Sequence, residues 1–133
     1  MAVYSDLDIS FVKDPVSRDI PVLTEEEAVK QSVMNLLYTN FYERPFQPAL
    51  GNSIMLRLFE PYDDITEIVL ANDIRNVIRQ FEPRATVKFV DVYKNRGPQN
   101  EMLDEHAILI EVGFIVQNIP QIQTTRLVLK RVR

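Results

Sequence analysis

An acidic and a basic side chain flank a proline at Glu82, Pro83 and Arg84, directly after a long apolar repeat. Proline disfavours helical backbone in the residue before it, so Glu82 should be extended and the helix should end there. Residues two apart in an extended segment point to the same side, which would place a carboxylate and a guanidinium together. Such a corner suits recognition of a protein partner, with the planar fork of Arg84 clamping carboxylates or carbonyls. The alternative is an ordinary helix stop with a surface ion pair worth about 0–1 kcal/mol.

A second basic group, Arg44, precedes Pro45 in a proline-rich loop between residues 40 and 54. These two residues could present another contact to a partner. The alternative is a stiff loop in which Arg44 is solvated or packed over Phe46. Gly51, in the same loop, should supply a positive backbone dihedral in a turn.

Hydrolytic chemistry would need a pair of carboxylates, because a glycosidase usually places two about 5–10 Å apart and raises the pKa of one. Glu82 would be a poor general acid beside Arg84, which would lower its pKa. The acids Glu101, Asp104 and Glu105 fall in an expected hairpin loop, where they would be weakly preorganised and lack the spacing of a calcium loop. The chain also has no tryptophan for a sugar platform. We therefore expect no catalytic residue.

The composition is poor in the groups that hold metals and cofactors. Cysteine is absent, which excludes a disulfide scaffold, a thiol nucleophile and a thiolate metal site. The single histidine, His106, stands near an expected strand start, where a structural role is the commoner one. Three glycines are too few for a phosphate-cradling loop. We expect neither a metal nor a cofactor.

Two helices and a short one should position the candidate residues. Thr24 and Glu27 read as a capping box, and apolar residues at helical spacing follow to Tyr38 or Thr39. A short helix is expected from Ile54 to Phe59. The second long helix should start after a cap at Asp63 or Asp64 and end at Phe81. Its apolar stripe consists of Leu70, Ile74, Val77, Ile78 and Phe81.

Three β-prone segments follow, at Thr86–Tyr93, His106–Val116 and Thr124–Val132. Alternation predicts the two faces of each strand. In the first segment Val87 and Phe89, with Asp91 as a further candidate, should alternate with Lys88, Val90 and Val92. In the second, Ile108, Ile110, Val112 and Phe114 should share one face, and Leu109, Glu111, Gly113 and Ile115 the other. In the third, Leu127 and Leu129 should face opposite Arg126, Val128 and Lys130. Helices followed by strands indicate an α+β fold, in which the helices pack on a small antiparallel sheet.

We interpret residues 24–133 as a single α+β domain and residues 1–23 as an extended N-terminal arm. Phe11 and Val12 of this arm could dock on the domain. The chain has 133 residues, a net charge of −4 and no apolar run near the roughly 20 residues of a membrane span. The first residues do not resemble a secretory signal. With the absence of cysteine, these features fit a protein that folds in a reducing cytoplasm and binds neither nucleic acid nor membrane.

Several short motifs occur in a characteristic order between about Tyr4 and Leu129. They are Ala28-Val29-Lys30-Gln31-Ser32, Leu36-Leu37-Tyr38-Thr39, Glu43-Arg44-Pro45-Phe46-Gln47-Pro48 with Gly51, Leu58-Phe59-Glu60-Pro61 and Glu82-Pro83-Arg84. In order and spacing the series resembles the baseplate wedge and sheath-initiator family of contractile phage tails and type VI secretion baseplates. Members of that family have sometimes been labelled lysozyme-like.

The resemblance implies an α+β unit similar to the inner domain of contractile sheath proteins, set in the baseplate around the tail tube. It implies that Glu82, Pro83 and Arg84 dock into the core bundle of the wedge proteins, with Arg44 and Pro45 as further contacts. The implied partners are the wedge proteins, the sheath protein and, as a third candidate, the tail tube. A ring of six copies is implied as well.

A sheet edge would offer a route to sheath initiation. The third strand, at Leu127 and Leu129, could accept an extended arm of a sheath subunit and template the first ring. The alternative is an edge blunted by Lys130 and Arg131. Two competing functions remain: a cell-wall hydrolase of the tail tip and an adaptor module with no role in a tail.

Overall fold

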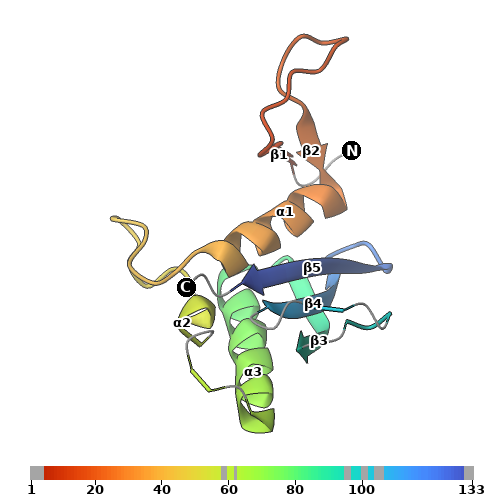
Figure 1. Cartoon of the computed structure of the whole chain (residues 1–133). Coiled ribbons are helices and arrows are strands. Elements are labelled where there is room, and N and C mark those ends of the chain that lie inside the picture. The colour runs from red at the N-terminus through yellow and green to blue at the C-terminus, as the bar shows by residue number, and fades with distance from the viewer. Residues whose placement is uncertain are drawn as a thin grey trace.

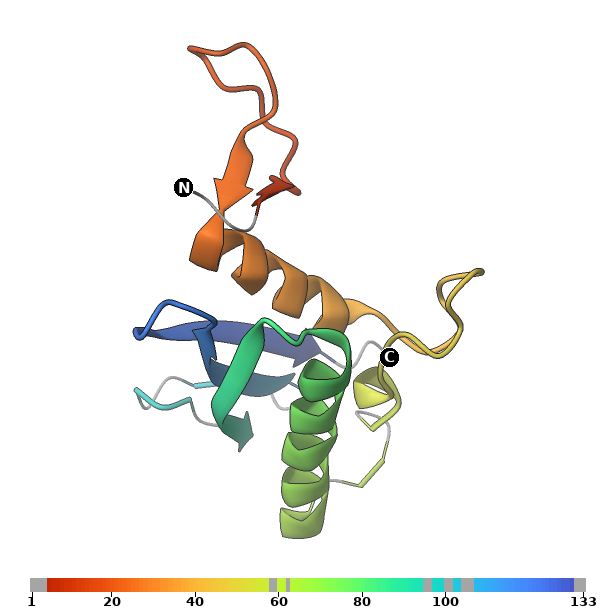
Figure 2. The same cartoon turned by 180° about the vertical axis from the view of Figure 1, so that it is seen from behind.

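The computed structural model describes residues 5–57, 60–61, 63–94, 97–99, 102–103 and 107–130, and it confirms the α+β class (Figure 1). Helices α1 and α3 pack on one face of a three-stranded sheet, and a two-stranded hairpin projects from the start of α1 (Figures 1 and 2). The elements are β1 (Ser5–Leu7), β2 (Val22–Thr24), α1 (Glu25–Tyr38), α2 (Ile54–Arg57), α3 (Asp64–Phe81), β3 (Ala85–Lys94), β4 (Ala107–Val116) and β5 (Ile122–Lys130).

Helix α1 begins and ends where predicted, but the predicted capping box is wrong. The Thr24 side chain makes no capping hydrogen bond. Thr24 is still the last residue of β2 and pairs with Ser5, so the hairpin sets its orientation. The chain then enters the helix through Glu25, whose φ of 52° lies in the left-handed region.

Helix α3 is capped by the first of the two predicted aspartates and ends at the predicted residue. The Asp63 carboxylate accepts hydrogen bonds from the Thr66 hydroxyl at 2.8 Å and from the Thr66 amide at 2.7 Å. These two bonds, the hydroxyl bond first, lower the pKa of Asp63. The side chains of Leu70, Ile74 and Ile78 are buried against the sheet. The end predicted for α2, at Phe59, lies outside the described residues.

The three-stranded sheet has the order β3-β4-β5 and is antiparallel throughout. Strand β4 is central, and its core face is the predicted one. The buried side chains of that face are Ile108, Ile110, Val112, Phe114 and Val116. On β5 the prediction is also confirmed, because Leu127 and Leu129 are buried and Val128 is exposed.

The predicted alternation along β3 is correct beyond Phe89 but wrong for Val87, because the strand contains a bulge. Val87 packs against the core and does not share the face of Phe89. The register shifts between Val87 and Phe89, so the alternation changes phase there. Val90 and Val92 consequently enter the core, whereas Phe89 pairs with Gly113 on the opposite face. The Phe89 ring occupies the space above this glycine, since a Cβ built on Gly113 would lie 2.1 Å from Phe89 Cε1.

The N-terminal segment folds back on itself rather than running as a single extended arm. Strands β1 and β2 pair antiparallel, and the loop between them projects away from the sheet (Figure 2). The Gln31 side chain of α1 fixes this hairpin, because its amide donates to the Leu7 carbonyl at 2.8 Å and accepts from the Ile9 amide at 2.9 Å. Docking of Phe11 and Val12 on the body is not found, since they are 62% and 65% exposed.

Candidate partner-binding site

The predicted acid–base corner is present at the junction of α3 and β3, and its two side chains form a forked ion pair. Arg84 Nε donates to Glu82 Oε1 at 2.6 Å, and Arg84 Nη2 donates to Glu82 Oε2 at 2.6 Å. The two donors of a planar guanidinium thus match the two oxygens of one carboxylate, which fixes the direction of the Arg84 side chain.

Ser32 of α1 is a third donor to the Glu82 carboxylate, through a hydrogen bond from its Oγ to Oε2. Burial alone would raise the pKa of Glu82. The hydrogen bonds from Arg84 and Ser32, together with the charge of Arg84, outweigh burial and hold the pKa below its usual value. Glu82 is therefore ionised at neutral pH and joins α1 to the α3–β3 corner.

The two members of the ion pair differ in exposure, and this separates their roles. The Glu82 side chain is 3% exposed, whereas that of Arg84 is 32% exposed. Neither sequence alternative fully describes this pair, because both assumed that Glu82 lies at the surface. A partner would contact Arg84 and the exposed Pro83. The buried Glu82 would fix the position of the Arg84 side chain.

The backbone of the corner is fixed to both of its neighbours. The Ala85 amide donates to the Glu82 carbonyl at 3.2 Å, which closes a tight turn over Pro83. The Gln117 amide donates to the Arg84 carbonyl at 2.9 Å, which ties the corner to the end of β4. The Arg84 guanidinium therefore projects from a rigid support.

The loop that carries Arg44 and Pro45 lies near this corner. Arg44 lines a cleft of about 250 Å³ together with Ser32 and Phe81, and Ser32 is the residue that donates to Glu82. The structure thus places both predicted sets of binding residues around one side of α1. Phe46 is 98% exposed, so the alternative in which it covers Arg44 is wrong.

Gly51 and Asn52 hold the base of this loop. Gly51 has the predicted positive φ, of 133°, and a Cβ there would lie 2.7 Å from the Asn40 carbonyl carbon. Asn52, which the sequence analysis missed, is 2% exposed. Its side-chain amide donates to the Leu36 and Leu37 carbonyls at 3.0 Å each, and its oxygen accepts from the Ile54 amide. One side chain thus caps the end of α1 and the start of α2.

The predicted sheath contact falls on an edge strand, but its two named side chains are not available. Strand β5 pairs only with β4 among the described strands. Leu127 and Leu129 are 1% and 3% exposed, and they belong to the core. Only the backbone edge and the outward residues of β5 could meet a partner.

The acids considered for hydrolysis, Glu101, Asp104 and Glu105, and the single histidine, His106, lie outside the described residues. Within the described ranges, no group of three or more histidine, aspartate or glutamate side chains is placed to hold a metal ion. No helix in the same ranges is long and apolar enough to cross a membrane.

Comparison with known proteins identifies the family. The family model described as "Baseplate wedge protein gp25" matches residues 23–121, which is more than half of the chain. The chain belongs to the baseplate wedge protein gp25 family. Its members are structural components of the baseplates of phage tails and contractile injection systems.

One curated relative and two solved structures illustrate the likeness. Baseplate wedge protein gp25 of Enterobacteria phage T4 is 25% identical over 118 residues, covering 89% of this chain and 83% of the T4 protein. A chain of the anti-feeding prophage baseplate has a TM-score of 0.64 at 20% identity, covering 94% of this chain and 83% of that one. A Geobacter sulfurreducens protein, provisionally described as a tail lysozyme, has a TM-score of 0.71 at 20% identity, covering 85% and 97%. At these identities the two structural matches show the fold alone.

Proposed function

We propose that this chain is a non-enzymatic wedge component that docks on neighbouring wedge proteins through Arg84. The observation that carries the proposal is the forked pair, in which a buried carboxylate holds a guanidinium that is one third exposed. Three donors converge on Glu82, and this arrangement fixes Arg84 before a partner arrives. A partner therefore meets a guanidinium whose conformational entropy has already been lost, which favours affinity.

Arg44 and Pro45 would extend this contact. Their loop is braced by backbone hydrogen bonds, including Tyr42 amide to Pro48 carbonyl at 3.0 Å and Gln47 amide to Arg44 carbonyl at 3.2 Å. Both Arg44 and Pro45 are exposed, and Arg44 shares a cleft with Ser32. The chemistry of these groups fits a partner surface that supplies carboxylates or helix C-terminal carbonyls.

The second part of the proposal is initiation of the sheath. The outer backbone edge of β5, which pairs with no other described strand, would accept an extended arm of a sheath subunit and so template the first ring, with six copies of this chain around the tube. The burial of Leu127 and Leu129 restricts such a contact to backbone pairing and to outward side chains such as Val128, which is 49% exposed.

A cell-wall hydrolase is the competing function, because one protein of the same fold is provisionally described as a tail lysozyme. Glu82 does not suit the role of general acid. Its pKa is lowered, whereas a general acid needs a raised pKa to stay protonated at neutral pH. Turbidity loss of purified peptidoglycan tests this point directly. We expect none from the pure chain, and activity abolished by a single Glu→Gln change would overturn the proposal.

Copurification with the wedge proteins tests the docking site. We expect Arg84→Ala to weaken wedge binding by about tenfold or more, as removal of an anchoring arginine commonly does. Arg57→Ala is the matched control, because Arg57 is also a partly exposed arginine, at 26%, and pairs with a carboxylate, at 2.7 Å from Asp73. Equal binding of the wild type and Arg84→Ala, with both equally folded by circular dichroism, would refute docking through this corner.

A further inference from the structure

The loop that joins α1 to α2 carries aromatic side chains that the rest of the described fold does not cover. We call residues 40–50 the aromatic loop. Phe41, Tyr42 and Phe46 are 44%, 84% and 98% exposed. In Figures 1 and 2 the loop is the yellow segment that projects from the body between the two helices. These rings therefore contribute little to the core, and the largest exposure falls on Phe46.

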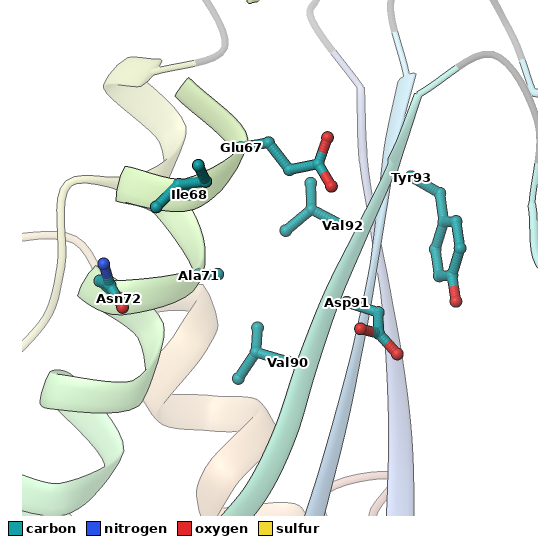
Figure 3. A pocket seen from close by; sticks show the side chains of 8 residues that line it. All are labelled: Glu67, Ile68, Ala71, Asn72, Val90, Asp91, Val92 and Tyr93. Carbon is teal, nitrogen blue, oxygen red and sulfur yellow. The ribbon is translucent and has the colours of Figure 1, made fainter. Parts of the chain in front are cut away.

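Other exposed apolar side chains of this protein lie beside packed surface. Ile68 of α3 is 63% exposed, but it lines a cleft together with Val90 and Val92, which Figure 3 shows directed from β3 toward α3. Phe46 has almost its whole surface in solvent instead. A single exposed apolar residue needs no explanation by itself. The backbone that holds Phe46 provides the further evidence for a role in binding.

Three successive β-turns give the aromatic loop a fixed shape. Amide-to-carbonyl hydrogen bonds of 3.3, 3.2 and 3.0 Å close turns over residues 40–43, 44–47 and 47–50. Pro45 and Pro48 occupy the second position of the last two turns, where the φ of proline is already the one that a turn requires. The loop is thus ordered by its own hydrogen bonds and prolines.

The two most exposed rings stand at the third position of their turns. Tyr42 has a φ of 64°, in the left-handed region, and its amide donates to the Pro48 carbonyl at 3.0 Å. A bulky residue keeps such a backbone only where the surrounding structure imposes it. Phe46 follows Pro45 at the third position of the middle turn. Both rings are therefore displayed by a backbone that is ordered before a partner arrives, which lowers the entropic cost of binding.

Charge beside the rings specifies the partner further. The Glu43 carboxylate is used inside the loop, where it accepts from the Asn40 amide at 2.8 Å. Arg44 is exposed, and its side chain forms no ion pair with the described residues. The charge that the middle turn offers to a partner is therefore positive. A surface that fits would carry a carboxylate next to an apolar pocket.

We propose that Phe46 is the apolar anchor of wedge docking and fills a pocket of side-chain size on a neighbouring wedge protein. Tyr42 packs at the margin of this pocket with its hydroxyl in water, and a carboxylate of the same protein pairs with Arg44. Interfaces commonly depend on a few such anchors in desolvated pockets. The inference rests on the proposed function, because Arg44 belongs to the loop contact proposed above.

The affinity for purified wedge complexes that lack this chain, measured by isothermal titration calorimetry, tests the anchor. We expect Phe46→Ala to weaken binding about tenfold or more, whereas Phe46→Leu should retain most of the affinity because the pocket needs apolar volume. Leu56→Ala is the matched control, since Leu56 is 69% exposed on α2, outside the aromatic loop. Phe46→Ala should keep the urea midpoint of the wild type, because the ring packs on almost nothing in the free chain. Wild-type affinity of a folded Phe46→Ala chain, or an equal loss in the control, would overturn the anchor.

A charge series tests the carboxylate of the pocket. Arg44→Glu should weaken binding, whereas Arg44→Lys should retain most of it, because the partner's carboxylate needs a cation. Equal affinity of all three chains would refute this carboxylate.

Photo-cross-linking tests which protein the ring contacts. Chains with Phe46→benzoylphenylalanine or Leu56→benzoylphenylalanine would be assembled into baseplates, irradiated and analysed by mass spectrometry. We expect a wedge protein in the product from position 46 and little product from position 56. Products from position 46 that contain only the sheath or tube protein, or no partner at all, would overturn the pocket.

Failure of the anchor differs from failure of the docking proposal. Wedge binding that depends on Arg84 but not on Phe46 would overturn the anchor alone. A wild-type chain that does not bind the wedge complexes would overturn the docking proposal together with this inference.

Discussion

Replacing Glu82 by glutamine tests how far the buried carboxylate holds the corner together. Glutamine keeps the volume, but it loses the charge and turns an amide donor toward the guanidinium of Arg84. Breaking a fully buried ion pair costs about 3–5 kcal/mol, whereas an exposed pair contributes about 0–1 kcal/mol. Glu82 is 3% exposed and Arg84 is 32% exposed, so this pair lies between those limits. We therefore expect Glu82→Gln to lower the free energy of unfolding by about 2 kcal/mol.

Urea unfolding followed by circular dichroism measures this change. For a chain of 133 residues, 2 kcal/mol corresponds to a fall in Tm of about 6–10 °C. Glu111→Gln is the matched control, because Glu111 also pairs with an arginine but the pair is more exposed, at 16% and 45%. A loss below about 0.5 kcal/mol for Glu82→Gln, or a loss no larger than that of the control, would refute the argument that the buried carboxylate holds Arg84 in place.

Three further predictions concern stability, each measured by the same urea unfolding. The pKa of Glu82 lies below its ordinary value of 4.5, so its stabilisation is complete above that pH and is lost as the pH falls through the lower folded pKa. The difference between the wild type and Glu82→Gln should therefore shrink as the pH falls below 4.5, and a constant difference would contradict the ionised pair. Asn52→Ala should cost about 2–3 kcal/mol, because it removes the buried hydrogen bonds that Asn52 makes to the Leu37 carbonyl and the Ile54 amide and one of the two to the Leu36 carbonyl. A loss below about 1 kcal/mol would contradict the capping role. Gly113→Ala should cost about 1–3 kcal/mol in the wild type but little in a Phe89→Ala background, since the ring then no longer blocks the new methyl group. Equal costs in both backgrounds would argue against this contact.

The sequence was sufficient to predict the features set by local patterns. Proline at position 83 ended α3 at the predicted residue, and alternation on β4 and β5 gave the correct buried faces. The α+β class followed from the order of helical and strand segments. These features depend on near neighbours in the chain, which propensity and periodicity describe well.

Features set by distant contacts were missed. Nothing near Glu82 in the sequence reveals that Ser32, fifty residues earlier, donates to it. The sequence did contain a hint of this hydrogen bond. Ser32 lies on the same side of α1 as the buried residues Val29 and Leu36, where a hydroxyl group is expected to have a hydrogen-bond partner. Asn52 gave no such signal, since a polar residue in a proline-rich loop ordinarily faces solvent.

The bulge in β3 and the N-terminal hairpin show two other limits. Simple alternation cannot detect the extra residue of a bulge, so Val87 was wrongly placed on the same face as Phe89. The hairpin depends on pairing between residues 5–7 and 22–24 and on the Gln31 side chain, none of which a helical or strand period detects. In both cases the decisive interaction was a tertiary one.

Incorporation into assembled particles tests the central claim most directly. Tails would be assembled with the wild type, Arg84→Ala or Arg57→Ala. Quantitative mass spectrometry would measure the amount of this chain per particle, and electron microscopy would show whether sheath is present. The account predicts that Arg84→Ala is largely absent from particles, which then lack ordered sheath, while Arg57→Ala matches the wild type. Normal incorporation and normal sheath with a folded Arg84→Ala chain would contradict docking through the Glu82-Pro83-Arg84 corner.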